Sequence, residues 1–390
     1  MTAATGFKIC FVAHNAYSAL TGRNVDHVGG VERQQAMMAD WLSAQGNEVT
    51  VITWGQNESI EQNDAGVKLQ YLCKKSAGLP VLRFIFPRWL SLIGALRKVD
   101  ADIYYYNLGD LALGQIVAWS KRNRKTVVYS VSSESVCNSD LRGVLSLRER
   151  LFYRFGVRNV DNIIVQTATQ SKLMREEFGR DTKLLPMPCA DLAAAGNAAR
   201  PPLAQTTPRV LWVGRLSKEK RPSWILDIAE KCPGLHFDVV GRANQNTDYS
   251  QQFLRRAGSM KNVAVHGAVK HDEIGRFYQN AQAIMCTSEY EGFPNVFLEA
   301  WSMGLPTVTT FDPDSIVLDE SLGFVSSSVS QVADDLQALM GDDTAWLRFS
   351  HNARQYFLTH HEAQRALPLF ANALEQFVDI AGSSHSVARG

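Results

Sequence analysis

The chain alternates short β-branched strand patterns with longer helical patterns along almost its whole length, and this alternation constrains the fold most. In the first half, predicted strands lie at 8–13, 49–53, 103–106, 126–131 and 162–166. In the second half they lie at 210–213, 236–240, 263–266, 283–287 and 307–309. Strands that alternate with helices form parallel sheets with helices on both faces. The pattern therefore predicts an α/β chain of two doubly wound domains.

A segment without periodicity separates the two sets of strands. Residues 191–208 are rich in Ala, Pro and Thr, a composition typical of a linker. The predicted organisation is an N-terminal domain at 1–190, a linker at 191–208, a C-terminal domain at 209–362 and a C-terminal helix with a tail at 363–390. The helical pattern over 363–378 is long enough to pack back across the first domain.

The charge balance argues against a nucleic-acid binder. The chain carries 40 Lys and Arg against 39 Asp and Glu, whereas nucleic-acid binding domains show a strong basic excess. The two halves nevertheless differ, because residues 1–190 carry 23 basic and 17 acidic residues and residues 191–390 carry 17 and 22. We expect the basic first half to face an acceptor or a membrane.

The cysteines and the start of the sequence point to the cytoplasm. Six cysteines are scattered without a C-x-x-C pair, as in proteins whose thiols stay reduced. Residues 1–8 show no basic and apolar signal pattern, and the most apolar stretch, 81–99, is interrupted by Arg83, Pro87 and Arg88. We therefore expect neither a signal peptide nor a membrane-spanning helix.

Two glutamates flank a Gly-Phe-Pro-Asn sequence directly after the predicted strand at 283–287. Gly292 allows a ligand to approach the backbone, and a helix beginning near Asn295 would direct free N–H groups at an anion. Glu291 precedes this helix and Glu299 lies more than a turn inside it, so they cannot act as one acid–base pair. We expect them to hold two hydroxyl-bearing parts of one ligand; the alternative is an ordinary helix start with one solvated glutamate.

A cationic loop follows the first strand of the second half. Gly214 and Arg215 are followed by Lys220, with Lys218 and Arg221 nearby. At the end of a strand these cations could neutralise a diphosphate and stabilise it as a leaving group. A charge run is also common on a solvated face.

A glycine pair, Gly29 and Gly30, opens the first helix of the first half, after a long loop. Adjacent glycines before a helix suit close backbone contact with a phosphate or a sugar, although glycine pairs are common in turns.

Together these motifs resemble a family 4 glycosyltransferase, a retaining enzyme of the GT-B fold that uses nucleotide sugars. The resemblance rests on Gly-Gly-Val-Glu at 29–32, Gly-Arg-Leu at 214–216 with a lysine at 220, and two glutamates eight residues apart at 291 and 299. It covers most of the chain, is most specific over 209–308, and extends to bacterial cell-surface polysaccharide glycosyltransferases through residues 104–106, 292–295 and 311–314. It implies two Rossmann-like domains facing a cleft.

The resemblance also implies roles for individual residues. Arg215 and Lys220 would bind the donor diphosphate, Glu299 the ribose, and Glu291 with nearby amides the transferred sugar; Glu291, Arg215 and Lys220 are the predicted catalytic residues. The predicted donor-binding residues are Gly29, Gly30, Gly214, Arg215, Lys220, Gly292, Phe293, Pro294, Asn295, Val296 and Glu299. No metal and no cofactor is expected beside the UDP- or GDP-sugar donor.

Two departures from the family pattern concern the acceptor side. A histidine common after the strand at 126–131 is missing, so Ser132 or Ser133 would take its place, and Glu134 is a further candidate. A Gly-Gly-x-x-Glu segment common after the last core strand is replaced by Asp312-Pro-Asp314. Paired aspartates can chelate a metal, but we expect a turn or a sugar contact here.

Other residues are weaker candidates. His14 and His27 lie in the loop before the first helix and could touch either substrate, although an isolated loop histidine is commonly incidental. Trp301 and Met303 are expected to pack in the core. Apolar residues at helical spacing within 89–99, flanked by basic residues, form either a lipid-binding face or an ordinary core-packed helix.

The sequence thus predicts a cytoplasmic or inner-membrane-associated glycosyltransferase that transfers a sugar to a saccharide, with a lipid-linked acceptor expected. The alternatives are a catalytically silent sugar-nucleotide-binding subunit and a GT-B-type nucleotide-sugar epimerase.

Overall fold

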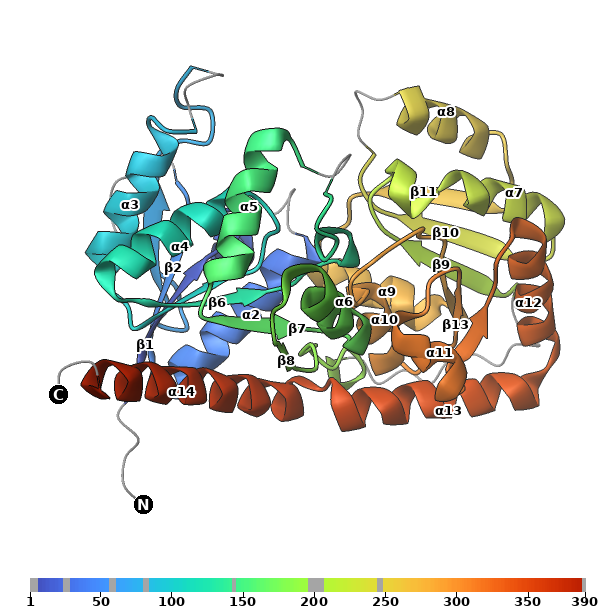
Figure 1. Cartoon of the computed structure of the whole chain (residues 1–390). Helices are drawn as coiled ribbons and strands as arrows, with labels where there is room; N and C mark the ends of the chain where they lie inside the picture. The colour runs from blue at the N-terminus through green and yellow to red at the C-terminus, as the bar shows by residue number, and fades with distance from the viewer. Residues whose placement is uncertain are drawn as a thin grey trace. The chain divides into compact units, whose positions relative to one another are not determined.

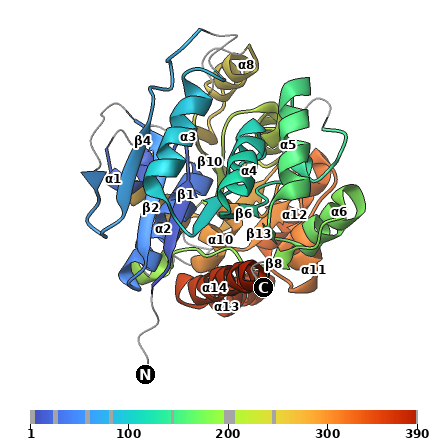
Figure 2. The same cartoon turned by 60° about the vertical axis from the view of Figure 1, so that its left-hand side comes forward.

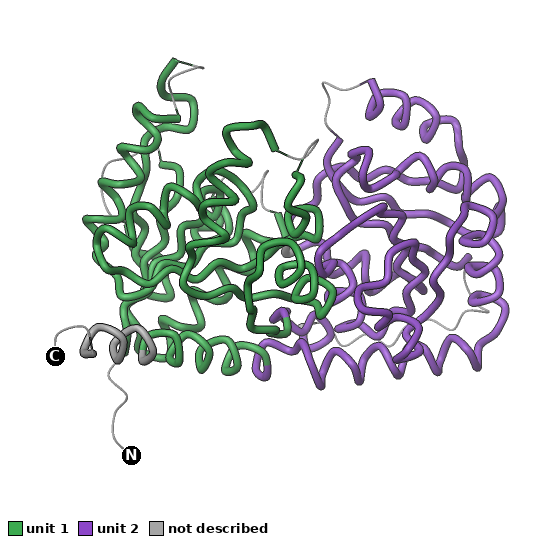
Figure 3. Tube along the Cα trace, viewed as in Figure 1, with its two compact units in different colours: residues 1–186, 366–390 green, residues 187–365 purple. Residues whose placement is uncertain are grey.

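The computed structural model describes residues 6–23, 29–55, 61–79, 84–141, 145–195, 207–243 and 248–387. It divides into two compact units (Figure 3). Unit 1 comprises residues 1–186 and 366–390, and unit 2 comprises residues 187–365. Each unit has its own sheet and its own apolar core.

Unit 1 is built on an eight-stranded sheet with the order β3-β4-β2-β1-β5-β6-β7-β8 (Figures 1 and 2). The strands are β1 Lys8–Val12, β2 Glu48–Trp54, β3 Glu61–Gln62, β4 Lys68–Leu72, β5 Ile103–Tyr106, β6 Thr126–Ser130, β7 Asn162–Val165 and β8 Lys183–Leu184. Among the described strands, β3 pairs antiparallel with β4 and the other pairs are parallel. The helices are α1 Tyr17–Thr21, α2 Gly30–Ala44, α3 Arg88–Val99, α4 Leu111–Asn123, α5 Leu147–Asn159 and α6 Ala168–Phe178.

Tyrosines form much of the core of unit 1. Tyr104, Tyr106, Tyr129 and Tyr153 are almost fully buried, and each hydroxyl has a partner. The Tyr104 hydroxyl, for example, donates to the Leu96 carbonyl at 2.8 Å. Burying a tyrosine is favourable only when its hydroxyl is bonded, so these partners fix the strands against the helices.

Helix α3 packs its periodic apolar residues in the core of unit 1, which was one of the two alternatives for residues 89–99. Leu92, Ala95 and Leu96 are buried and belong to the core of unit 1, with Ile93 packed against it. The periodic apolar residues of this helix therefore face the protein, so the interpretation of this face as a lipid-binding face is wrong. Among the described residues, no helix is both long and apolar enough to cross a bilayer.

Unit 2 is built on a six-stranded parallel sheet with the order β11-β10-β9-β12-β13-β14. The strands are β9 Arg209–Val213, β10 His236–Val240, β11 Val263–Gly267, β12 Ala283–Cys286, β13 Thr307–Thr309 and β14 Gly323–Val325. The helices are α7 Ser223–Lys231, α8 Asp248–Ala257, α9 His271–Asn280, α10 Asn295–Ser302, α11 Ile316–Asp319, α12 Val329–Gly341 and α13 Asp343–His360. Because β9 and β12 are neighbours, the loops that follow them meet at one edge of the sheet.

The chain passes between the units at residues 186/187 and again at 365/366. Residues 196–206 of the predicted linker lie outside the described part, whereas Asp191 forms a bidentate ion pair with Arg354 inside unit 2. The last helix, α14 (Ala363–Val387), begins in unit 2 and continues in unit 1. Its buried Phe370 contacts Tyr105 with ring centroids 5.5 Å apart, which confirms the predicted return of the C-terminal helix to the first domain.

Candidate functional site

The predicted donor-binding loops lie side by side in unit 2. The amide of Glu289 donates to the Glu219 carbonyl at 2.8 Å, and the Thr287 hydroxyl donates to the Lys220 carbonyl at 2.6 Å. The Thr287 hydroxyl also accepts from the Trp212 indole N–H of β9 at 3.0 Å. The end of β12 therefore holds the cationic loop in place through its backbone.

The two loops are joined by an ion pair between Lys220 and Glu291. Both side chains are largely buried, and Glu291 Oε1 accepts from Lys220 Nζ. Ser288 Oγ donates to the same oxygen at 2.6 Å. The structure thus brings together one predicted phosphate ligand and one predicted sugar ligand, and each partly neutralises the other.

Ser288 was missed by the sequence interpretation. Its carbonyl accepts from the Thr310 hydroxyl at 2.8 Å and from Arg221 Nη2 at 3.3 Å, so three segments converge on it. A hydroxyl residue directly after a strand and three residues before a candidate glutamate is a signal that could have found it.

Arg215 is far more exposed to solvent than Lys220. Its side chain is 79% exposed, and its guanidinium lies 3.7 Å from Glu219 Oε1. Burial acts to raise the pKa of Glu219, but the Ser217 hydroxyl bond and the charges of Arg215 and Lys220 outweigh it and lower that pKa below its usual value. Glu219 is therefore a stable counter-charge that lies within the cationic loop.

Gly214 directly follows β9 and lies beside the end of β10. Its amide donates to the Val240 carbonyl at 3.0 Å, and a Cβ on Gly241 would lie 1.7 Å from the Gly214 carbonyl oxygen. Gly241 also has a φ of +151°, so glycine is required at that position.

The start of α10 presents backbone amides at the same edge. Its first intrahelical bond runs from the Phe297 amide to the Pro294 carbonyl at 3.0 Å, so the amides of Asn295 and Val296 precede the hydrogen-bonded helix. Phe293 is buried against Trp301 and His361, so only its backbone can contact a ligand. Pro294 has no N–H, and the candidate amide donors are therefore those of Gly292, Phe293, Asn295 and Val296.

Glu299 is buried and lies within α10, whereas Glu291 lies in the loop before it. One carboxylate oxygen accepts from the Tyr278 hydroxyl of α9 at 2.5 Å. Tyr278 is 21 residues away in sequence, and no local pattern predicts this contact. Trp301 is fully buried and Met303 packs against the core, as predicted.

The described candidate residues of unit 1 follow its strands or lie at the start of α2. His14 is buried and stacks on Trp54 with ring centroids 4.9 Å apart, and burial lowers its pKa. Gly29 caps α2, where a methyl group would lie 2.4 Å from Glu32 Oε2, and Gly30 is the first helical residue. His27 lies outside the described residues.

The acceptor-side serines adopt a local cap. Ser133 Oγ accepts from the Ser135 amide at 3.3 Å and caps the short helical turn Glu134–Val136, and Ser132 immediately precedes this cap residue. Glu134 and Ser132 are both half-buried.

The Asp-Pro-Asp segment forms a turn. Asp312 accepts from the amides of Val317 at 2.8 Å and Leu318 at 3.2 Å, and thereby caps the start of α11. Asp314 has a φ of +51°, in the left-handed region that turns favour. The expectation of a turn is therefore confirmed.

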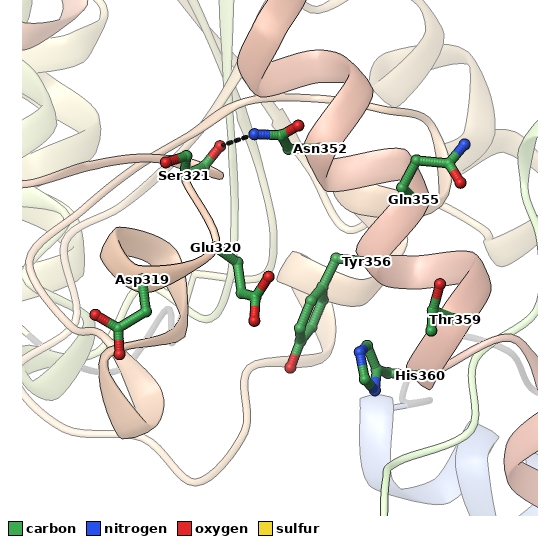
Figure 4. A pocket seen from close by; sticks show the side chains of 8 residues that line it. All are labelled: Asp319, Glu320, Ser321, Asn352, Gln355, Tyr356, Thr359 and His360. Carbon is green, nitrogen blue, oxygen red and sulfur yellow. Dashed lines mark hydrogen bonds between the residues drawn. The ribbon is translucent and has the colours of Figure 1, made fainter.

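A cavity of about 340 Å³ lies elsewhere in unit 2, between α11 and α13 (Figure 4). Asp319, Glu320, Tyr356 and His360 contribute to its lining, and no predicted site residue does.

Comparison with known proteins decides the family. Residues 28–189 match the model described as Glycosyltransferase Family 4, and residues 207–342 match the model described as Glycosyl transferases group 1. The two matches together cover about three quarters of the chain and include both candidate loops. The chain belongs to the family 4 glycosyltransferases. This glycosyltransferase is 22% identical over 85% of its length to an uncharacterized glycosyltransferase of Haemophilus influenzae, of which it covers 92%.

Solved structures give the fold of this glycosyltransferase. It aligns with sucrose-phosphate synthase from Thermosynechococcus elongatus with a TM-score of 0.74 and 18% identity, over 96% of this chain and all of the other. It aligns with the Anabaena HepE structure with a TM-score of 0.72 and 17% identity, over 95% of this chain and all of the other. The enzyme therefore has the GT-B fold.

Proposed function

We propose that this glycosyltransferase moves a sugar, with retention of configuration, from a nucleotide diphosphate donor to a hydroxyl of a lipid-linked saccharide. The process would be bacterial exopolysaccharide, capsule or lipopolysaccharide synthesis at the inner face of the plasma membrane. The observation that carries the proposal is the convergence of Lys220, Glu291 and Ser288 beside the amides at the start of α10. The expected donor is a UDP- or GDP-sugar, and the Anabaena HepE structure, which contains UDP and glucose, supports the first of these.

Donor binding would give Lys220 a second partner beside Glu291. In the ligand-free pair the ammonium contacts Glu291, whereas a donor diphosphate supplies two further negative charges. Arg215 is exposed and can turn towards a phosphate without leaving a buried partner behind. Lys220 would then share its charge between phosphate and Glu291, and Glu291 could accept a sugar hydroxyl.

The chemical step needs no protein nucleophile. The acceptor oxygen bonds to the anomeric carbon on the face that the phosphate leaves, the bond from that carbon to the phosphate oxygen breaks, and the acceptor proton passes to the departing phosphate. Lys220 and Arg215 stabilise the charge on the leaving diphosphate. Because these cations take this part, we expect activity without a divalent metal.

The test is donor hydrolysis and transfer by the purified protein. Thermal-shift measurements with UDP-, GDP- and ADP-sugars identify the base, and hydrolysis of that donor identifies an enzyme. Full activity in EDTA is expected, and activity that disappears with EDTA and returns with manganese would contradict the metal-independent mechanism. Donor binding without hydrolysis or transfer would favour the silent sugar-nucleotide-binding subunit.

A further inference from the structure

Helix α5 exposes a line of large apolar side chains. Leu147, Leu151 and Phe155 are spaced four residues apart, so they lie along one side of the helix, and each is between 42% and 66% exposed. The opposite side is fixed, because Tyr153, Gly156 and Val157 are buried in unit 1. Single exposed apolar residues are ordinary on a protein surface, but a continuous line of them indicates a contact surface.

A second exposed apolar group lies next to this line. Ile85, Phe86 and Leu90, at the start of α3, are between 44% and 67% exposed. Two contacts join the groups: the Trp89 ring packs on Phe152 of α5 at 5.6 Å, and the Arg148 guanidinium lies 3.9 Å from the Phe84 ring centroid. The six exposed side chains therefore form one surface, which we call the basic apolar surface.

The charges of the basic apolar surface have one dominant sign. Residues 84–99 contain three Lys and Arg and no acidic residue, and α5 contains four arginines and one glutamate. That glutamate, Glu149, is occupied in the capping box with Ser146. Arg88 donates to the Lys75 carbonyl at 2.5 Å, which adds the exposed Lys74–Lys75 segment to the same region.

The basic apolar surface lies at the carboxyl edge of the unit 1 sheet. Helices that precede a parallel strand begin at that edge, and α3 precedes β5 while α5 precedes β7. Figures 1 and 2 show both helices packed about α4 in unit 1. The loops that carry His14, Gly29 and Ser132 follow strands or open a helix at the same edge.

We propose that the basic apolar surface binds an anionic lipid bilayer. Its leucines and phenylalanines would enter the boundary between headgroups and acyl chains, and its arginines and lysines would pair with lipid phosphates. This assignment rests on the proposed lipid-linked acceptor, which it would deliver to the edge of unit 1 where the acceptor-side candidates lie. The basic apolar surface differs from the lipid-binding face suggested by the sequence within residues 89–99, because Leu92 and Leu96 of that face are buried in the core.

The test is co-sedimentation of the full-length protein with vesicles. Vesicles of phosphatidylcholine and phosphatidylglycerol should bind the protein, and vesicles of phosphatidylcholine alone should bind it at least about tenfold more weakly. The double variant Leu151→Glu with Phe155→Glu should lose about tenfold or more in affinity, because it removes two inserted side chains and adds two negative charges. Arg148→Glu should weaken binding most at low salt.

The matched control is Leu318→Glu with Leu347→Glu, which changes two exposed leucines in unit 2. This control should bind vesicles like the unaltered protein. Vesicle binding by the α5 double variant equal to that of the unaltered protein would overturn the proposal. If the double variant changed its oligomeric state without a change in vesicle binding, the surface would instead bind a protein partner. Soluble-donor hydrolysis should persist in the α5 double variant. If the unaltered protein did not hydrolyse the soluble donor, the proposed function would be refuted. The vesicle-binding result would still test the lipid-binding surface independently.

Discussion

At the scale of single residues, the pair of Lys220 and Glu291 is the most consequential contact of the donor-side site. Both charges are largely shielded from water, so each depends on the other. Removing one partner of such a pair leaves a charge that is expensive to bury, whereas replacing both by neutral groups of similar shape can cost little. Comparing single with double replacement of the pair can therefore distinguish its effect on stability from its effect on catalysis.

We predict that Lys220→Met lowers kcat/KM for donor hydrolysis by about 10²–10³-fold, because electrostatic stabilisation of the leaving group is lost. It should also lower the Tm. Adding Glu291→Gln should restore the Tm but not the activity. Lys218→Ala, an exposed lysine of the same loop, is the control and should change neither. Recovery of activity in the double variant would show that the pair is structural only.

Unlike Lys220, Arg215 should contribute to donor binding but little to stability. Its exposed side chain forms a long ion pair with Glu219, so Arg215→Gln should change the free energy of unfolding by no more than about 0.5 kcal/mol. Donor affinity, measured by calorimetric titration, should fall about tenfold if one charge-assisted phosphate contact is lost. Unchanged affinity would remove Arg215 from the site.

At the scale of elements, α4 and α5 pack through glycines. A Cβ on Gly114 would lie 2.2 Å from the backbone oxygen of Phe152, and one on Gly156 would lie 2.6 Å from Leu113 Cγ. The helices are thus close enough for backbone contact, which holds α5 and its exposed apolar line in place.

Gly114→Ala should therefore destabilise the protein by about 1–3 kcal/mol, because backbone must shift to admit the methyl group. Gly94→Ala is the matched control in α3, where nothing lies within 4 Å of the added Cβ. It should stabilise the protein by about 0.5–1 kcal/mol through helix propensity. Urea unfolding measures both, and equal effects of the two substitutions would contradict close packing of α4 and α5.

At the scale of the whole molecule, the two passages of the chain between the units are tied together within unit 2. The Cys189 amide donates to the His361 carbonyl at 2.9 Å, and the Ala363 amide donates to the Cys189 carbonyl at 3.0 Å. The buried His361 ring contacts the Met187 carbonyl through Nδ1 at 2.9 Å. Each passage is therefore anchored by the other.

This anchor should make stability depend on pH. Burial lowers the pKa of His361 to about 4, whereas an unfolded histidine has a pKa of about 6.5. Between these values the unfolded state binds the extra proton, so stability rises with pH across this window and falls as pH drops from 6.5 to 4. The loss is about 3 kcal/mol at most.

His361→Gln should flatten the pH dependence of the free energy of unfolding between pH 4 and 6.5. His351→Gln, at an exposed position of α13, is the control and should keep the slope of the unaltered protein. A slope that survives in His361→Gln would place its origin at another group.

The elements that were predicted well are those whose signal is local. The strands at 236–240 and 307–309 have the predicted bounds, because short apolar and β-branched runs mark buried parallel strands without reference to distant residues. Strands β3, β4, β8 and β14 were missed. Strand β4 mixes Lys and Gln with apolar residues. Strands β3 and β8 are only two residues long and β14 only three, so their partners define them.

The candidate site divides in the same way. The loops containing Arg215, Lys220 and Glu291 follow strands and carry recognisable motifs, so sequence alone could nominate them. The contact of Tyr278 with Glu299 and the convergence on Ser288 join residues that only neighbouring strands and helices bring together. The ligand roles of all these residues stay predictions.

The sequence by itself determined the two α/β domains, the family and the loops that carry its motifs. The periodicity of apolar residues and the spacing of motif residues depend only on residues close together in the chain. The tertiary structure decided which apolar faces are covered. Leu92 and Leu96 of α3 are buried while Leu147, Leu151 and Phe155 of α5 are exposed, although the apolar residues of both helices recur at helical spacing. It also paired Lys220 with Glu291. Burial and pairing depend on what packs opposite a residue, and no local pattern contains that information.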